Sequence, residues 1–224
     1  MIPSTTLAVS QQADGRRFAL VKRGEEWCIR VDGTVLMSSR SHASEVALAE
    51  HALEGLSSKR SVLVGGLGLG FTLRAVLDRV PATARVTVCE LVPAVAEWNQ
   101  RHVGHLARHP LSDPRTSLEI GDVFDVLQRS SAQFDTILLD VDNGPVAASS
   151  AGNHRLYEPA GALVCLRALR PSGVLAVWSR DKDERFERVL KDAGFGLEVL
   201  RVPAHRRGRT RHVLFLATRS RKPG

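Results

Sequence analysis

Three glycines, Gly66, Gly68 and Gly70, occupy the segment VLVGGLGLGFTLRAVL, where a buried strand is expected to turn into a helix. Glycine at these positions lets the backbone approach a ligand closely, and the free N–H groups of the helix start face that ligand. Glu90, 20 positions after Gly70, ends the next apolar run, where its carboxylate can accept hydrogen bonds from the two hydroxyls of a ribose. Together these residues predict a crevice that binds a nucleoside.

The spacing of the glycines narrows the choice of nucleoside. Dinucleotide-binding loops read G-x-G-x-x-G, in which the third glycine lets the helix pack closely over a pyrophosphate. This chain has G-x-G-x-G, with Phe71, Thr72 and Leu73 opening the helix. The shorter form resembles the loop of class I S-adenosylmethionine-dependent transferases, which implies S-adenosylmethionine or decarboxylated S-adenosylmethionine as the cofactor.

Two more acids follow apolar runs, Asp122 in IGDVFDVL and Asp140 in FDTILLDVDNGP. Ligands of doubly wound sheets bind outside the carboxyl ends of the strands, so acids at these ends are candidates for ligand contacts. Asp122 alone is also explained as the N-cap of a helix that begins at Val123. Three strand-end acids behind a glycine loop are harder to explain as caps. We therefore expect Glu90, Asp122 and Val123 to bind the cofactor together with the glycines.

The chain after residue 60 alternates apolar runs with helical segments. The expected strands are SVLVGG, ARVTVCE, TSLEIGD, FDTILLD, GVLAVWS, LEVLRV and HVLFLAT, and the expected helices lie near residues 72–79, 93–106, 123–129, 157–169 and 183–193. This alternation predicts right-handed βαβ units and a mostly parallel sheet covered on both faces. The last two strands have no helix between them and should form an antiparallel hairpin at the sheet edge. The predicted fold class is α/β, Rossmann-like, with seven strands.

The N-terminal 41 residues have a different pattern. The short alternating segments RFALVKR, EWCIRVDG and TVLMS are separated by turn residues, which predicts a small antiparallel β-meander. A helix over residues 42–56 should carry the chain into the main domain. The predicted division is therefore a meander at 1–41 and a Rossmann-like, S-adenosylmethionine-binding domain at 42–224.

The composition is that of an ordinary globular protein, with 43% hydrophobic and 25% charged residues among 224. No apolar run reaches the length of about 18 residues that a membrane span needs, and the N-terminus lacks the pattern of a secretion signal. We therefore expect a cytoplasmic protein without a membrane partner. The three cysteines are far apart and have no metal-ligand spacing, so no metal site is predicted.

The net charge of +7 comes from the C-terminus. Residues 201–224 hold eight Lys or Arg and no acid, so residues 1–200 have a net charge of −1. Half of these cations lie in the loop from Arg206 to His212, which joins two edge strands and is expected to lie far from the glycine loop. No aromatic residue is interleaved with them to stack bases, so a nucleic-acid partner is an alternative that the sequence does not favour.

The successive segments VLVGGLGLGFTLRAVL, VCELVPAVAEWNQ, DPRTSLEIGDVFDVL, FDTILLDVDNGP and LYEPAGALVCLRALRPSGVLAVWS resemble the blocks of spermidine synthase and its relatives, which share the class I methyltransferase fold. The resemblance implies that Glu90 holds the ribose, Asp122 the adenine amino group and Gly66 to Gly70 the methionine side of the nucleoside. It also implies that Asp140 is the carboxylate that faces the reacting amine. Asp142 would be the second catalytic acid, although it stands one position earlier than in the D-x-x-D pattern of that family.

Several departures from the family pattern concern binding of a diamine. Leu69 replaces the acid of the glycine loop, Leu36 replaces a glutamine, and Glu45, Val46 and Ala47 stand where the family has a Tyr-His-Glu cluster. Because a dication needs several carboxylates to offset its desolvation, these losses favour a methyltransferase acting on a small-molecule amine or hydroxyl.

Other interpretations stay open at this level. The first alternative is a polyamine aminopropyltransferase of the spermidine synthase type, and the second is a non-catalytic nucleoside- or RNA-binding relative. Asp140 and Asp142 with Asn143 are an alternative oxygen site for a divalent metal, without an evident third acid. His154 is a candidate base, although a lone histidine in a loop is more often only solvated. The oligomeric state is also open, with a homodimer as one candidate.

Overall fold

A computed structural model describes residues 3–55, 61–141, 153–205 and 209–220. The N-terminal part is a four-stranded antiparallel sheet in the order β1-β2-β3-β4. Its strands are β1 (Ser4–Gln11), β2 (Arg17–Arg23), β3 (Glu26–Val31) and β4 (Thr34–Ser38). The sequence predicted the last three but not β1. Every side chain of β1 is exposed or half-buried, because it is an edge strand, and it therefore lacks the alternating apolar signal of its neighbours.

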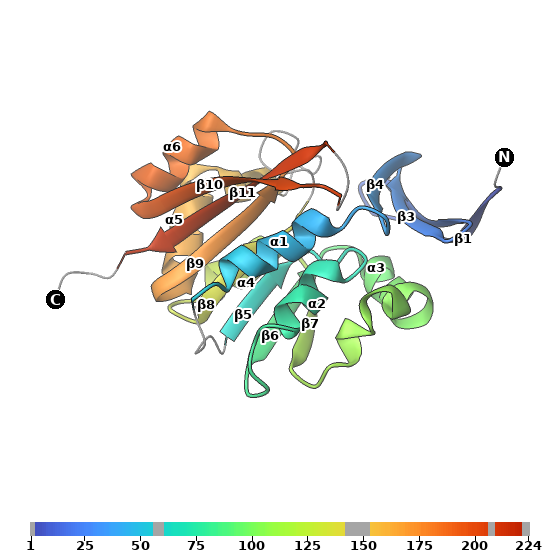
Figure 1. The fold of residues 1–224 in the computed structure, drawn as a ribbon, viewed down its shortest axis with the longest axis horizontal. Helices are drawn as coiled ribbons and strands as arrows, with labels where there is room; N and C mark the ends of the chain where they lie inside the picture. Colours follow the sequence, from blue (N-terminus) through green and yellow to red (C-terminus); the bar gives the residue numbers. More distant parts are fainter. Residues whose placement is uncertain (1–2, 56–60, 142–152, 206–208, 221–224) are drawn as a thin grey trace.

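The main sheet has seven strands in the order β10-β11-β9-β8-β5-β6-β7. In chain order they are β5 (Ser61–Gly65), β6 (Arg85–Glu90), β7 (Thr116–Ile120), β8 (Phe134–Leu139), β9 (Leu169–Ser179), β10 (Phe195–Pro203) and β11 (Arg211–Arg219). Strands β5 to β9 are parallel, whereas β11 pairs antiparallel with both β9 and β10. The predicted α/β fold with a C-terminal antiparallel hairpin is thus confirmed, and Figure 1 shows the meander at one end of the molecule, beside this sheet.

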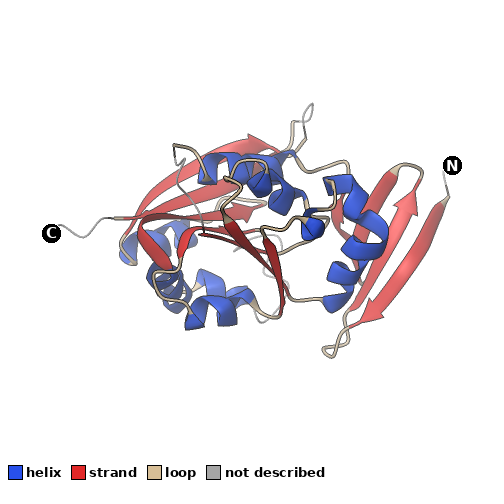
Figure 2. Cartoon of the chain, turned by 90° about the horizontal axis from the view of Figure 1, so that it is seen from below, coloured by secondary structure: helices blue, strands red, loops and turns tan. Residues whose placement is uncertain are grey.

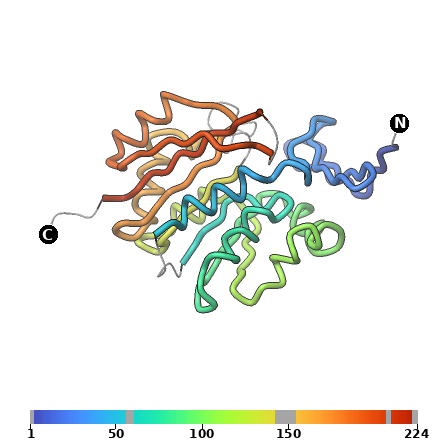
Figure 3. The backbone as a smooth tube through the Cα atoms, viewed as in Figure 1, coloured from blue at the N-terminus to red at the C-terminus, as the bar shows by residue number. Residues whose placement is uncertain are grey.

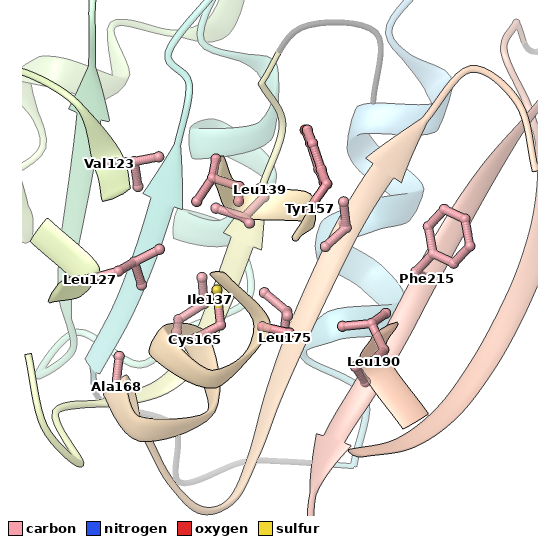
Figure 4. Close-up of a cluster of buried hydrophobic side chains, with 14 of the residues drawn as sticks. Val123, Leu127, Ile137, Leu139, Tyr157, Cys165, Ala168, Leu175, Leu190 and Phe215 are labelled. Carbon is pink, nitrogen blue, oxygen red and sulfur yellow. The ribbon is translucent and has the colours of Figure 1, made fainter. Parts of the chain in front are cut away.

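Helices cover both faces of the main sheet (Figure 2). They are α1 (Ala43–Ala52), α2 (Phe71–Leu77), α3 (Pro93–Trp98), α4 (Val123–Arg129), α5 (Pro159–Ala168) and α6 (Glu184–Asp192). Helices α4, α5 and α6 pack on one face, in the apolar cluster of Figure 4, and α1 and α2 pack on the other. Within the described ranges, no helix is long and apolar enough to cross a membrane.

The helix predicted over residues 93–106 is interrupted. Helix α3 ends at Trp98, a π-helical turn follows over Asn99–Val103, and a 3-10 turn covers Gly104–Ala107. The side chain of Asn99 explains the break, because its Nδ2 donates to the carbonyls of Val95 and Gly68, at 3.0 and 2.7 Å. A side-chain amide that bonds backbone carbonyls competes with regular helical hydrogen bonds. The sequence pattern, which is apolar at helical spacing throughout, does not reveal this competition.

A third apolar cluster joins the meander to the main domain. Phe18 and Ile29 of the meander pack with Leu69 and Phe71 of the glycine loop and with Trp98 of α3. In the tube of Figure 3, the chain passes once from the meander into α1 and then into the large sheet. The meander therefore lies against the carboxyl ends of the central strands, where the predicted nucleoside crevice should be.

Candidate active site

A cavity of about 380 Å³ lies between the meander and the carboxyl ends of the central strands. This volume is in the usual range for a small-molecule site. Its walls contain six of the residues that were predicted to bind cofactor or catalyse: Gly66, Gly68, Glu90, Asp122, Val123 and Asp140. The polar wall also contains residues that were not predicted to act there: Arg16, Ser41, Glu45, Arg180, His205 and His212.

The glycine loop passes directly over the end of β8. Gly66 has a φ of +90°, and a Cβ atom at this position would lie 2.2 Å from the carbonyl oxygen of Asp140. The backbone N–H of Asp140 donates to the carbonyl of Gly65, and that of Gly66 donates to Cys89, at 2.9 and 2.8 Å. Only glycine fits between these strand ends, which explains why the chain has a glycine at position 66.

Gly70 has a different place from the other two glycines. It is the N-cap of α2 with a φ of 84°, and it lies beside Pro110, Asn99 and Ala107 rather than in the cavity wall. Its part in the site is to start α2, which brings Thr72 toward the end of β8.

Glu90 ends β6, and its carboxylate is turned onto the glycine loop. Oε2 accepts from the backbone N–H groups of Leu67 and Gly68, at 2.9 and 3.5 Å, and Oε1 accepts from Val92 at 2.9 Å. Burial raises the pKa of Glu90, and these backbone donors oppose that rise. The same carboxylate faces the cavity, so it can hold the loop in shape and accept hydrogen bonds from a ligand.

Asp122 combines two roles that the sequence treated as alternatives. Its Oδ1 accepts from the backbone N–H of Phe124 at 2.8 Å, which is the N-cap of α4. Its Oδ2 accepts from Arg155 at 2.7 Å, and the guanidinium of Arg155 lies over the ring of Phe124. Asp122 and the first helical residue, Val123, nevertheless line the cavity beside Glu90.

Asp140 lies just after β8 and is half-buried in the cavity wall. The hydroxyl of Thr72, in the first turn of α2, donates to its Oδ2 at 2.5 Å. Burial raises the pKa of Asp140 to about 6, and the bond from Thr72 opposes the rise. Sequence reasoning named Thr72 only as part of the helix start, and its contact with Asp140 was not predicted.

Glu45 was named in the sequence only as a departure from the Tyr-His-Glu cluster, not as a site residue. This residue of α1 is only 7% exposed and lines the same cavity as Asp140. Burial, followed by the negative charge of Asp140, raises the pKa of Glu45 to about 8. A signal existed in the sequence, because Glu45 precedes Leu48 and Ala49 by three and four residues and therefore shares their buried face.

Other residues singled out in the sequence lie elsewhere. Leu69 is fully buried in the cluster that joins the meander to the main domain, and Leu36 lines the cavity as an apolar side chain. His154 is exposed, and its Nδ1 lies 3.5 Å from a carboxylate oxygen of Glu158. Asp142 and Asn143 fall outside the described residues. Among the described residues, no group of three or more His, Cys, Asp or Glu side chains is arranged to hold a metal ion.

The expectation that the C-terminal basic loop lies far from the glycine loop is wrong for its last residue. Residues 206–208 are outside the described ranges, but His212 lines the cavity. The reason is the antiparallel direction of β11, in which Val213 pairs with Ser179 at the carboxyl end of β9. The first residues of β11 therefore lie at the same edge as the carboxyl ends of the parallel strands.

The geometry can be compared with known proteins. The spermine/spermidine synthase domain matches residues 41–190 of this chain. A polyamine aminopropyltransferase of Prochlorococcus marinus (strain MIT 9313) is 31% identical over 147 residues, covering 65% of this chain and 49% of that protein. A spermidine synthase of Dictyostelium discoideum is 27% identical over 146 residues, with the same two coverages of 65% and 49%. The chain thus spans about half the length of these curated relatives.

Solved structures of spermidine synthases share the fold of this chain. The crystal structure of spermidine synthase from Thermotoga maritima has a TM-score of 0.77 at 19% identity, covering 96% of this chain and 73% of that one. A spermidine synthase in complex with the transition state analogue AdoDATO has a TM-score of 0.76 at 18% identity, covering 96% and 72%. The fold and cavity therefore define a Rossmann-like domain of the class I methyltransferase type. Within that class, the chain belongs to the spermine/spermidine synthase family.

Proposed function

We propose that this protein transfers an aminopropyl group from decarboxylated S-adenosylmethionine to an amino group of a polyamine. The observation that carries the proposal is the position of Asp140, a half-buried carboxylate in the same cavity as the glycine loop and Glu90. The sequence departures favoured methyl transfer, but the similar proteins named polyamine aminopropyltransferase and spermidine synthase favour the alternative. The buried carboxylates of the cavity also suit an amine better than a neutral hydroxyl acceptor.

We call the part of the cavity around Gly66, Gly68, Glu90, Asp122 and Val123 the nucleoside half, and its residues fit an adenosyl group. Glu90 would accept hydrogen bonds from the ribose hydroxyls, because its buried carboxylate already lies against the glycine loop. Asp122 would accept from the adenine amino group, and Val123 would contact the ring from the start of α4. Gly66 and Gly68 would allow the sulfonium side to lie against the backbone.

When bound, the nucleoside supplies a carbon activated by its bond to a positively charged sulfur. The amine nitrogen forms a bond to that carbon, the carbon–sulfur bond breaks, and the electron pair leaves with sulfur as a neutral thioether. The nitrogen must lose one proton for this attack, and in this proposal the carboxylate of Asp140, which lines the cavity, accepts it. Thr72 orients Asp140 through its hydroxyl, while the apolar walls of the cavity exclude water.

The proposal is tested by incubating the purified protein with putrescine and either decarboxylated or intact S-adenosylmethionine. We expect spermidine and methylthioadenosine from the decarboxylated donor, detected by mass spectrometry. Asp140→Asn should reduce this turnover by about 10²-fold, while Asp125→Asn, an exposed acid on α4, should leave it unchanged. Methylated putrescine and S-adenosylhomocysteine as the main products would contradict aminopropyl transfer.

A further inference from the structure

The cavity has a basic end beside the last three strands of the main sheet. Arg180 follows β9, His205 lies after β10, and His212 lies at the start of β11. All three side chains line the cavity, and we call them the basic end. Between β10 and β11, the backbone N–H of Ala204 donates to the carbonyl of Thr210 at 3.0 Å. This bond keeps the residue after Ala204, His205, beside the start of β11.

Strand pairing fixes the positions of Arg180 and His212. Ser179 and Val213 are paired residues of β9 and β11. Because these strands are antiparallel, the residues just beyond this pair, Arg180 and His212, lie next to each other at the sheet edge. The ring of His212 also meets the ring of Trp178 edge-on, with 4.6 Å between the centroids. The sheet itself, and not the loop between β10 and β11, therefore holds these two basic side chains.

The basic end has hydrogen-bond donors without acceptors. Arg180 forms no ion pair with any other residue of the described ranges. Trp178 also lines the cavity, and its indole Nε1 is buried without a hydrogen-bond partner in the described structure. His212 Nδ1 lies 3.0 Å from Ser44 Oγ, which leaves Nε2 for a ligand. Because a donor left unpaired is costly, this end favours a ligand group that accepts hydrogen bonds.

The acids nearby do not balance the positive charge of this end. Burial lowers the pKa of His212, and the positive charges of Arg180 and His205 lower it further. Asp181 opposes this shift, but it is exposed to solvent. Burial raises the pKa of Glu45 to about 8, so that its carboxyl keeps a proton near pH 7 and carries no compensating charge. One permanent cation, Arg180, is thus available for one anionic group.

The order of the strands places the basic end across Asp140 from the nucleoside half. Glu90 and Asp122 lie at the ends of β6 and β7, on one side of β8, whereas β9, β11 and β10 lie on the other (Figure 1). Neighbouring strands are about 4.8 Å apart, so β11 lies about 10 Å from β8. A short carbon chain that begins beside Asp140 can therefore reach the basic end. We call the part of the cavity that contains Asp140, Glu45 and the basic end the acceptor half.

We propose that the basic end binds a carboxylate of the acceptor, so that the preferred substrate is a diamine or polyamine that also carries a carboxylate. The inference rests on the proposed function, because it assigns the acceptor to this half of the cavity, and it leaves the reacting amine where that function places it. Arg180 supplies the charge and a planar pair of donors for the carboxylate. It is therefore a specificity-determining residue, and His205 and His212 supply ring nitrogens beside it.

Two amines that differ by one carboxylate test the inference. L-Ornithine is putrescine with a carboxylate added beside one amino group. Each is titrated at pH 7 into protein saturated with methylthioadenosine, and calorimetry gives the two affinities. We expect the wild type to bind L-ornithine at least about tenfold more tightly than putrescine. Arg180→Gln should reduce this preference by at least about tenfold, and Arg180→Lys should retain part of it, because the charge stays but the planar pair of donors is lost.

Arg211→Gln is the matched control. Arg211 precedes His212 in β11, is exposed and does not line the cavity, because successive side chains of a strand point to opposite faces. The variant removes the same charge from the same region as Arg180→Gln, so it should keep the wild-type preference for L-ornithine. Thermal melting of each variant checks that it is folded.

The outcomes separate this inference from the proposed function. Wild-type protein that prefers putrescine, or an unchanged preference in folded Arg180→Gln, would overturn the inference and leave aminopropyl transfer to putrescine standing. Binding of L-ornithine that depends on Arg180, without aminopropyl product from either amine, would support the inference and contradict the proposed function. Wild-type protein that binds neither amine would overturn both.

A further titration distinguishes the acceptor from the donor as the source of the carboxylate. Intact and decarboxylated S-adenosylmethionine also differ by one carboxylate, and both are titrated into the wild type and Arg180→Gln. We expect the ratio of these two affinities to be the same in both proteins. A loss in Arg180→Gln that is confined to intact S-adenosylmethionine, with the preference for L-ornithine unchanged, would assign the basic end to the donor and overturn the inference.

Discussion

The two halves of the cavity are built in different ways. In the half that we propose to bind the nucleoside, backbone groups hold the side chain of Glu90, which accepts from the N–H of Leu67, 23 residues away. In the acceptor half, side chains hold side chains across much longer separations: Thr72 holds Asp140 over 68 residues, and His212 lies against Ser44 over 168 residues. The contacts of Glu90 join neighbouring strands, whereas those of Asp140 and Ser44 join residues that are far apart in the chain.

A glycine such as Gly66 is fixed by the backbone that surrounds it, so the nucleoside half has little freedom to change. Leu36 and Leu69 are apolar, whereas Glu45 on α1 places a carboxylate in the cavity wall. The following predictions test this contrast, from the largest expected effect to the smallest.

Gly66→Ala should have the largest effect. Its Cβ would lie 2.2 Å from the Asp140 carbonyl oxygen, and its φ of +90° is unfavourable for alanine. We expect the free energy of unfolding to fall by about 3–5 kcal/mol, from the backbone strain and the displaced end of β8. Urea denaturation measures this change.

The control for that variant is Gly15→Ala. Gly15 has a similar φ of +87°, but a Cβ there would have no neighbour within 4 Å. Its substitution should lower the free energy of unfolding by only about 1–2 kcal/mol. Equal losses in the two variants would mean that strain alone, and not the crossing over β8, requires glycine at position 66.

The second prediction concerns the pH dependence of stability without ligand. The pKa values of Glu45 and Asp140 are raised from 4.5 and 3.8 to about 8 and about 6 by burial. The folded state therefore binds these protons more tightly than the unfolded state, so their contribution is present at low pH and is lost as pH rises through these values. Between pH 5 and pH 8 the free energy of unfolding should fall by a few kcal/mol from this pair.

Urea denaturation across this pH range checks the second prediction. Glu45→Gln should flatten the fall, because glutamine cannot ionise and the charge beside Asp140 is gone. Glu50 is on the same helix but is paired with Arg79 outside the cavity, so Glu50→Gln should retain the wild-type slope. A profile of Glu45→Gln parallel to that of the wild type would contradict the link between the two acids.

Asn99→Ala should have the smallest effect on stability but a clear effect on nucleoside binding. The variant loses the hydrogen bonds from Nδ2 to the carbonyls of Gly68 and Val95. Because one of these bonds holds the glycine loop, we expect methylthioadenosine binding to weaken by about 1–2 kcal/mol. Calorimetry measures the affinity, and Gln100→Ala, the exposed next residue, should bind as the wild type does. An unchanged affinity for Asn99→Ala would show that the loop needs no such support.

Local sequence patterns were sufficient to predict the main sheet and the strand-end acids of the cavity. The strand and helix alternation predicted the main sheet and its antiparallel hairpin, and strand-end acids predicted that Glu90, Asp122 and Asp140 share one cavity. These predictions succeed because a parallel sheet brings the ends of all its strands to one edge, whatever its other details.

The features that the sequence did not predict depend on contacts between distant residues, which a local sequence pattern does not indicate. Strand β1 has no buried face of its own, and the break after Trp98 depends on a bond between Asn99 and Gly68. His212 reaches the cavity through the direction of β11 rather than through its position in the chain. Glu45 had a detectable signal as an acid on the buried face of a helix, but its pairing with Asp140 required the folded structure.

The most direct test of the two-part cavity is methylthioadenosine binding to the wild type, Glu90→Gln and Glu45→Gln, measured by calorimetry on folded protein. We expect Glu90→Gln to weaken nucleoside binding by about 30- to 100-fold, because a buried charged hydrogen-bond acceptor is lost. We expect Glu45→Gln to bind the nucleoside within about twofold of the wild type, since Glu45 belongs to the acceptor half. Equal losses in both variants, or no loss in Glu90→Gln, would contradict the division of the cavity into these two halves.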